Sequence, residues 1–476
     1  MVRELVDTTD VHVSTRQALA RRVKEYMDEH QIPLTETAYT ALVKLWVRAG
    51  DLEQAAIWIQ EAEGVQQCRV KLRLYAPLLS AHCANGRLDE ALRVWLQLSR
   101  QGLTVSEREL VDLWKVATHC HSQVVIERLL SDLADEVPVP SHEMTAALKE
   151  WFATTHAVDE KQETSRKGLL DQIPSDAPKI GSLACDKPWT ISDGCTVDSD
   201  GILLDGCLKG SRLKPIHISE KAWSDLIAMN ETIVRDGEIK GHSSKFQGGR
   251  KGQKRKLDDR AREQREHHWR QFERFLESHQ PDVVVDGANV GYYETNFEGA
   301  PRHVDYKQID WVVDDLRRQG KKVLLIMHCR HFSRQTMPDE YVPLMKKWLN
   351  DRILYRTPPG MNDDWFWMHA ALSSGPGTLM VTNDELRDHH FQMLAERWFV
   401  RWKERHQVHF SFGSWLDGKR VVQLVYPEVY SRRIQRLGDG LVIPLPKQGD
   451  ENRFLDGQHV ADASEPAHET YLCLSS

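Results

Sequence analysis

Four aspartates stand out because of where they fall in the chain. Asp286 ends an apolar run of three valines, and Asp384 closely follows a second apolar run. Asp363 and Asp364 are adjacent and lie between them. Acidic residues that follow buried strands meet at the carboxyl edge of a parallel sheet, where open α/β folds place their ligands. Converging carboxylates repel one another unless a cation lies among them, and an all-oxygen set suits Mg²⁺, with Mn²⁺ as an alternative.

Each of these aspartates also has a purely structural explanation. Asp286 precedes a glycine, and an Asp-Gly pair is common in turns. Asp363 and Asp364 follow Asn362 and precede two tryptophans, so they could cap a helix and complement its dipole. Two acids at strand ends with an acidic pair between them nevertheless favour metal chemistry.

The chemistry that this set predicts is attack of a metal-activated water on a phosphodiester. We expect Asp286 and Asp384 to bind the metal directly, and Asp363 and Asp364 to bind it directly or through water. The sequence shows no Ser-His-Asp or Cys-His arrangement that would support a covalent intermediate. Basic residues downstream of Asp384 are expected to contact phosphates of the substrate: Arg387, Arg401, Lys403 and Arg405.

The elements around the aspartates alternate between strand and helix. Apolar runs predict strands at 322–327 and 379–381, and helical periodicity fills 311–318 and 342–350. This alternation is typical of a doubly wound α/β fold with a parallel sheet.

The first third of the chain predicts a helical solenoid. A motif around Tyr39 recurs 36 positions later around Tyr75, within a run of amphipathic helices from about 15 to 152. A period of this length with two helices per unit is typical of helical repeats. Such repeats bind proteins as often as nucleic acids, so periodicity alone leaves the partner open. The polar segment from about 153 to 180 predicts a linker.

Four sequence blocks resemble protein-only RNase P. They are 286–291, 355–365, 381–389 and 401–408, in the family's order. The resemblance implies a pentatricopeptide-repeat RNA-binding arm joined to a PIN-like metallonuclease domain of the NYN type. It implies an endoribonuclease that removes the 5′ leader of precursor tRNA and leaves 5′-phosphate and 3′-hydroxyl ends. It also implies that no RNA subunit is obligatory, and we expect a monomer.

The resemblance assigns roles to particular residues of this chain. The family's metal-binding aspartates correspond to Asp286, Asp363, Asp364 and Asp384, and two further members of the catalytic set would be Asp388 and His389. His389 would donate a proton or hold a phosphate, or it would simply cap a helix near the site.

The chain is therefore expected to be a multidomain protein. Residues 1–155 would form the helical repeat arm, and 263–415 the metallonuclease domain. A small β-rich central domain would be split between 180–235 and 416–476, because the family pairs such a segment with its C-terminal tail. The segment 236–262 would be a basic linker or insertion.

The family's central domain holds a structural zinc, and this chain departs from the ligand pattern. Leu204 and Val442 occupy two of the four ligand positions, which leaves Cys207 and Cys473. Structural zinc is normally held by four nitrogen or sulfur ligands. We therefore expect no structural zinc, and we expect the two aliphatic side chains to pack where the ion would lie. Two further residues could complete a zinc site if loops brought them in: Cys195 and His459.

Composition restricts the compartment more than the function. The net charge of −7 neither supports nor excludes RNA binding, because a local basic surface would be sufficient. Eight cysteines without disulfide-type spacing indicate a reducing compartment, and no apolar run reaches the length of a membrane span. The acidic start lacks a secretory or mitochondrial signal. A basic run at 248–256 favours the nucleus, with the cytoplasm as the alternative and the mitochondrion less favoured.

Two other functions stay open at this point. One is a NYN-type endoribonuclease that acts on another structured RNA. The other is a repeat-based RNA-binding scaffold with an inactive nuclease domain, although an inactive domain has no physical reason to keep a repulsive set of acids. The sequence fixes neither the number of metal ions, nor the general acid, nor the repeat residues that contact tRNA.

Overall fold

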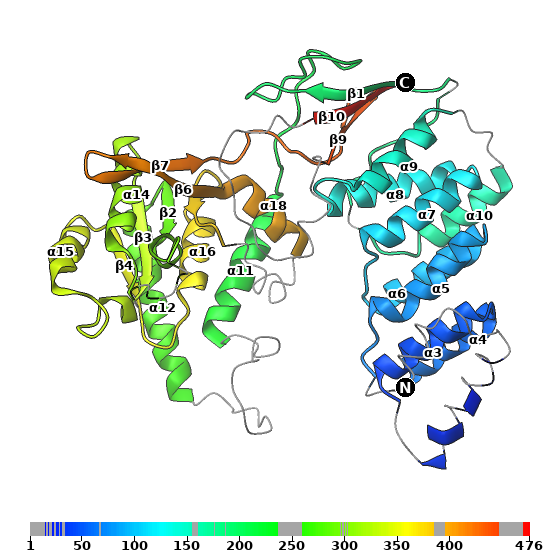
Figure 1. Ribbon diagram of the computed structural model, residues 1–476, viewed down its shortest axis with the longest axis horizontal. Coiled ribbons are helices and arrows are strands. Elements are labelled where there is room, and N and C mark those ends of the chain that lie inside the picture. Colours follow the sequence, from blue (N-terminus) through cyan, green and yellow to red (C-terminus); the bar gives the residue numbers. More distant parts are fainter. Residues whose placement is uncertain are drawn as a thin grey trace. The chain divides into compact units, whose positions relative to one another are not determined.

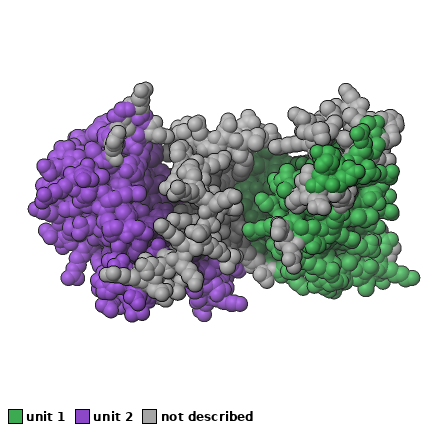
Figure 2. Space-filling model, turned by 90° about the horizontal axis from the view of Figure 1, so that it is seen from below, with its two compact units in different colours: residues 1–214, 431–476 green, residues 215–430 purple. Residues whose placement is uncertain are grey.

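The chain folds into two compact units in the computed structural model. One unit holds residues 1–214 and 431–476, and the other holds 215–430 (Figure 2). The structure describes 34–65, 68–154, 160–175, 177–185, 187–236, 259–295, 303–384, 396–446 and 470–476, with single residues between 15 and 30 and between 297 and 301. In this described part, no helix is both long and apolar enough to cross a membrane.

The N-terminal arm is a solenoid of helix pairs, as the sequence period predicts (Figure 1). Each pair leaves an apolar face that only its neighbour can bury, so the first helix of one pair packs on the first helix of the next. Gly50 and Gly86 lie two residues beyond the ends of the first helices of successive pairs. Both have a positive φ, which glycine adopts without strain. The helices are α3 (Glu36–Arg48), α4 (Leu52–Gly64), α5 (Leu72–Ala84), α6 (Leu88–Arg100), α7 (Glu107–His119), α8 (Gln123–Glu136), α9 (His142–Phe152) and α10 (Glu160–Leu170).

Helix α10 lies in the segment that was expected to be a linker, so that prediction was wrong. The helix packs against α6 and α8 although its sequence is mostly polar. Arg166 is buried and its Nε lies 3.0 Å from a carboxylate oxygen of Asp89, while Leu170 joins the hydrophobic core. Arg128 of α8 then donates to the carbonyl oxygens of Leu170 and Ile173, both at 3.1 Å. The buried Arg166, paired with a half-exposed Asp89, interrupts the apolar stripe that periodicity would detect.

A small antiparallel sheet follows the arm in the same unit. Its strands lie in the order β1 (Thr190–Thr196), β10 (Thr470–Ser475), β9 (Gly440–Pro444) and β8 (Gln435–Leu437). The predicted pairing of the C-terminal tail with the segment near 190 is therefore confirmed. Leucine and isoleucine side chains of β9 and β10 join the core of the arm: Leu441, Ile443, Leu472 and Leu474.

The second unit is built on a six-stranded sheet. Its order is β4 (Leu354–Thr357), β3 (Val323–His328), β2 (Val283–Asp286), β5 (Leu379–Val381), β6 (Gln407–Leu416) and β7 (Lys419–Val425). Neighbouring strands from β4 to β6 are parallel, and β7 pairs antiparallel with β6. This is the doubly wound sheet that the alternation predicted, with an added edge strand.

Helices cover both faces of this sheet (Figure 1). Val283 and Val285 join one hydrophobic cluster and Val284 joins the other, because successive side chains of a strand point to opposite faces. Helices α14 (Tyr306–Arg318) and α15 (Val342–Asn350) contribute to the first cluster. The second cluster holds residues of α11 (Glu220–Asp236), α12 (Asp259–His279), α16 (Asp363–Ser373) and α18 (Glu396–His406).

The division between the units differs from the expected domain boundaries. Helix α11 was assigned to the central domain, yet it packs on α12, α16 and α18 of the nuclease sheet. The β6–β7 hairpin continues that sheet beyond residue 415. The segments 180–235 and 416–476 are therefore each divided between the two units, since the chain crosses between units near 214 and 430.

Candidate active site

Asp286 is fixed at the carboxyl end of the central strand β2. It is 4% exposed, and it caps the short helix α13 (Gly287–Gly291). Its Oδ1 accepts a hydrogen bond from the backbone N–H of Asn289 at 3.1 Å, and its Oδ2 accepts one from the hydroxyl of Thr382 at 3.0 Å. Gly287 has no room for a side chain, because a Cβ would lie 2.4 Å from Met327 Cγ. The glycine is therefore required by packing.

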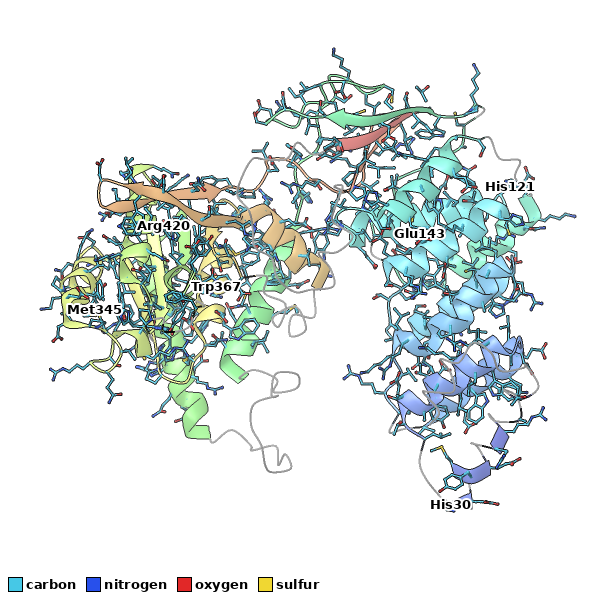
Figure 3. The ribbon with its side chains drawn as sticks, in the orientation of Figure 1. His30, His121, Glu143, Met345, Trp367 and Arg420 are labelled. Atoms are coloured by element: carbon cyan, nitrogen blue, oxygen red, sulfur yellow. The ribbon has the colours of Figure 1, made fainter. Side chains whose placement is uncertain are left out.

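Asp363 and Asp364 begin helix α16. The cap of this helix is Asn362, whose side-chain oxygen accepts from the backbone N–H of Asp364 at 3.2 Å. Asp363 is 7% exposed, and its Oδ2 accepts from the backbone N–H of His328 at 3.1 Å. Oδ1 of Asp364 accepts from the indole N–H of Trp367 at 3.3 Å. Trp367 is labelled in Figure 3. Because Asn362 supplies the cap, capping does not explain the two carboxylates.

Three of the aspartates act on one another electrostatically. Burial raises the pKa of Asp286 well above its ordinary value, and the charges of Asp364 and then Asp363 raise it further. Burial also raises the pKa of Asp363, with Asp364 as the next cause. The negative charges of these carboxylates are thus concentrated at a poorly solvated site, where nearby positive charge does not offset their repulsion. A divalent cation would remove this penalty.

Asp384 joins the same edge through the backbone of its loop. Its N–H donates to the hydroxyl oxygen of Thr382 at 3.1 Å, and that hydroxyl donates to Asp286. The N–H of Asn383 donates to the side-chain oxygen of Asn289 at 2.8 Å. These bonds join the loops after β2 and β5, so Asn289, Thr382 and Asn383 position the acids. They lie inside the sequence blocks, but no spacing rule marked them.

The expected phosphate-binding residues of α18 lie elsewhere. Arg405 donates to the carbonyl oxygen of Ile216 at 3.3 Å, and the His406 ring lies 3.1 Å from the carbonyl oxygen of Pro376, which precedes β5. Helix α18 therefore ends at the amino edge of the sheet, opposite the carboxylates. Arg401 stacks over Trp398 at 5.4 Å, and Lys403 is half-buried. Three residues lie outside the described part of the chain: Arg387, Asp388 and His389.

The donors present at the carboxyl edge fit a hydrated divalent metal. All four predicted ligands are carboxylates, which suit Mg²⁺ or Mn²⁺. Within the part of the chain that the structure describes, no three of these aspartates place ligand atoms within 4.8 Å of one another, as a tight cage would. Mg²⁺ usually keeps several waters, so it does not need such a cage.

A second acidic group lies among the helices of the same unit. Glu231 of α11, Glu273 of α12 and His369 of α16 place ligand atoms within 4.8 Å of one another. His369 is buried, and its Nε2 lies 3.0 Å from the hydroxyl oxygen of Ser373. No motif or spacing in the sequence predicts this group, because its members come from three separate helices. We assign no function to it.

The residues at the expected zinc position do not fit a zinc ion. Val442 is fully buried in β9, as expected, but Leu204 is 49% exposed, so the prediction that it fills the ion's place was wrong. Cys195 is the residue that packs there, because a Cβ on Gly206 would lie 2.3 Å from its sulfur. Burial and then a hydrogen bond with Cys195 raise the pKa of the Cys473 thiol. Within the described residues, no three cysteines, histidines or acids at this position place ligand atoms within 4.8 Å of one another. Cys207 is half-buried, and His459 lies outside the described residues.

Comparison with known proteins identifies the family. Residues 254–454 match the family described as protein-only RNase P, and residues 4–159 match the pentacotripeptide-repeat region of the same family. Together the two matches span about three quarters of the chain. The chain belongs to the protein-only RNase P family. It is thus an endoribonuclease by family, and the helical arm is a pentatricopeptide-repeat region.

Relatives of this protein-only RNase P come from plants and mammals. Proteinaceous RNase P 3 of Arabidopsis thaliana is 28% identical over 427 residues, which cover 87% of this chain and 69% of the relative. Proteinaceous RNase P 1, chloroplastic/mitochondrial, of the same plant is 29% identical and covers 90% and 68%. The mitochondrial ribonuclease P catalytic subunit of Rattus norvegicus is 28% identical over 49% of this chain and 35% of its own length.

The fold also agrees with a solved structure of this family. The crystal structure of nuclear proteinaceous RNase P 2 from A. thaliana superimposes with a TM-score of 0.61 at 24% identity, and the match covers 98% of this chain and 88% of the other. The multidomain fold class predicted from sequence is therefore confirmed. The names of the relatives include nuclear, chloroplastic and mitochondrial forms, so the family does not fix the compartment of this member.

Proposed function

We propose that this protein-only RNase P removes the 5′ leader of precursor tRNA by metal-dependent hydrolysis of one phosphodiester bond. The observation that carries the proposal is the acidic set of Asp286, Asp363 and Asp364 at the carboxyl edge of a nuclease sheet, of which the first two are buried. Membership of a family named for ribonuclease P supports the substrate. An electrostatic penalty of this kind is stable in evolution only if the charges perform a function.

The chain's own residues hold the reacting groups in place. Asp286, Asp363, Asp364 and Asp384 would hold Mg²⁺, which when bound lowers the pKa of a water and stabilises the leaving oxygen. Asp286 is held by two hydrogen bonds and Asp363 by one backbone N–H, so neither carboxylate has to be ordered when the substrate arrives. Asp363 or Asp364 accepts the proton of the attacking water. The products carry a 5′-phosphate and a 3′-hydroxyl.

The remaining parts of the proposal concern the partner and the compartment. The pentatricopeptide-repeat arm would bind the folded tRNA body, because a few repeats read shape better than sequence. The protein would act as a monomer without an RNA subunit. The basic run at 248–256 supports the nucleus, and it falls outside the described residues.

The test of this function is cleavage of a 5′-end-labelled precursor tRNA with Mg²⁺ and with EDTA. We expect a single metal-dependent cut at the mature 5′ end. A structured RNA of equal length without a tRNA body is the control, and we expect it to stay intact. Cutting of both RNAs at scattered sites would indicate a general endoribonuclease, and binding without cutting would indicate a scaffold.

A further inference from the structure

The segment after β3 reaches the carboxylates, although no sequence pattern marked it. Strand β3 pairs with β2 so that Ile326 lies opposite Asp286, which places His328 just beyond the acidic edge. The backbone N–H of His328 donates to Asp363. A short 3₁₀ helix, η1 (Cys329–Phe332), begins at the next residue. Its side chains are therefore neighbours of the catalytic carboxylates.

Arg330 of η1 is a cation at this acidic edge. Its charge lowers the pKa of Asp363, against the larger effects of burial and Asp364. The side chain is exposed, and among the described residues it forms no ion pair with a carboxylate. Its Nε donates to Nε2 of His331 at 3.2 Å. This bond occupies Nε and leaves the two terminal nitrogens of the guanidinium for another acceptor.

The surroundings of His331 hold its ring in place as the acceptor of that hydrogen bond. It is 3% exposed; its ring meets Tyr292 edge-on at 5.8 Å, and its carbonyl oxygen accepts from the hydroxyl of Tyr306. Burial, and then the charges of Arg330 and His328, lower the pKa of His331 to about 4. The imidazole is therefore neutral near pH 7, with a lone pair on Nε2. A buried histidine without a proton on Nε2 fixes the direction of the guanidinium.

We propose that Arg330 binds a phosphate of the RNA at the cleavage site and that His331 is the residue that positions it. This inference rests on the proposed function. A planar guanidinium matches two phosphate oxygens, and an arginine whose Nε is already bound loses less freedom when its terminal nitrogens bind. The arginine also offsets the repulsion between an incoming phosphate and the acidic edge. Arg405, near the end of α18, lies at the opposite edge of the sheet.

The test measures single-turnover cleavage of precursor tRNA over a range of enzyme concentrations. Arg330→Ala is expected to lower kcat/KM about 10- to 100-fold, the usual effect of losing a hydrogen bond to a charged group. Arg330→Lys keeps the charge and should recover only part of the rate. Arg318→Ala is the matched control: Arg318 is exposed at the end of α14, on the amino side of β3, and should cleave at the parent rate.

The role of His331 is tested in the background of the arginine variant. His331→Phe removes the acceptor and should lose about 10-fold, whereas His331→Gln restores an acceptor and should recover most of the rate. In Arg330→Ala, the change His331→Phe should cost nothing further, because a positioning residue acts only through the residue it holds. A merely structural histidine would give an additive loss in the double variant. Thermal unfolding of each variant excludes global loss of the fold.

The outcomes separate this inference from the function on which it rests. If the parent and Arg318→Ala cut the leader while Arg330→Ala cuts equally well, the inference about Arg330 is wrong and the function stands. If the losses at Arg330 and His331 add, the positioning role of His331 is wrong. If the parent does not cut precursor tRNA at all, the function fails and this inference fails with it.

Discussion

The family resemblance implies two metal sites, and this chain keeps the full set of expected ligands at only one of them. At the carboxyl edge of the nuclease sheet, all four expected aspartates are present, and burial raises the pKa of two of them. In the central sheet, Leu204 and Val442 stand at two of the four zinc positions, and the buried thiols of Cys195 and Cys473 lie against each other. One site keeps its charges at an energetic cost, and the other has aliphatic residues at two ligand positions, of which only Val442 is buried.

The difference follows from what each metal does. A structural zinc supplies free energy of folding, and buried apolar side chains supply the same quantity. Val442 and the leucines of β9 and β10 can therefore take over that task. A catalytic metal supplies a reactive water and charge in the transition state, which no apolar side chain can provide. The two sites consequently evolve under different constraints.

The largest expected effect compares one residue from each place. Asp384→Asn should lower the single-turnover cleavage rate on the order of 10³-fold, because a ligand to the catalytic metal loses its charge. Cys473→Ser should change the same rate less than about threefold, because it holds no metal. Equal losses for both variants would show that the central sheet still carries a metal on which activity depends.

The second largest effect concerns Val442 and Leu204, the two aliphatic residues at expected zinc positions, which differ in burial. Val442→Ala removes two methyl groups from a fully buried position and should lower the free energy of unfolding by about 2 kcal/mol. Leu204→Ala, at a half-exposed position, should change it by less than about 0.5 kcal/mol. Urea unfolding followed by circular dichroism measures both values.

Metal analysis of the parent chain and of these variants tests whether the central sheet is stabilised by packing and not by zinc. We expect no stoichiometric zinc in the parent chain, and no shift of its melting temperature when zinc is chelated. One zinc ion per chain would overturn the account of Val442 and would mean that Cys195, Cys207 and Cys473 are deprotonated ligands.

The smallest expected effect is a gain of stability at the catalytic edge. The folded-state pKa of Asp286 lies above its unfolded value, so the ionised carboxylate destabilises the folded chain as pH rises through the folded pKa. Asp286→Asn without Mg²⁺ should therefore unfold with about 1 kcal/mol more free energy at pH 8, and the gain should shrink as pH falls. Added Mg²⁺ should stabilise the parent and not the variant. Equal stability of both proteins at pH 8 would contradict the repulsion.

Sequence reasoning located the acids but not everything that acts on them. The strands, the repeat period and the aspartates each produce a local pattern, so they could be predicted. Helix α10 was missed because its buried face includes the ion-paired Arg166. Strand β7 was missed because its exposed positions include Val421 and Val425, so the usual alternation is absent.

The basic residues illustrate why sequence distance misleads near a site. Arg401, Lys403 and Arg405 follow Asp384 closely along the chain, but α18 runs back across the sheet for about 16 Å at 1.5 Å per residue. Arg330 lies 33 positions from Asp363, the nearest of the four aspartates, yet parallel strand pairing brings its loop to the same edge. Only the register of β2 and β3 reveals this neighbour.

The central claim is that the buried aspartates hold the metal that cuts the leader. The most direct measurement is the Mg²⁺ dependence of single-turnover cleavage of precursor tRNA by the parent and by Asp363→Ala, with Asp351→Ala as an exposed, ion-paired control. We predict a saturable dependence on Mg²⁺ for the parent and the control, and no cleavage by Asp363→Ala at any Mg²⁺ concentration. Parent-like cleavage by Asp363→Ala, or cleavage that continues in EDTA, would contradict the account.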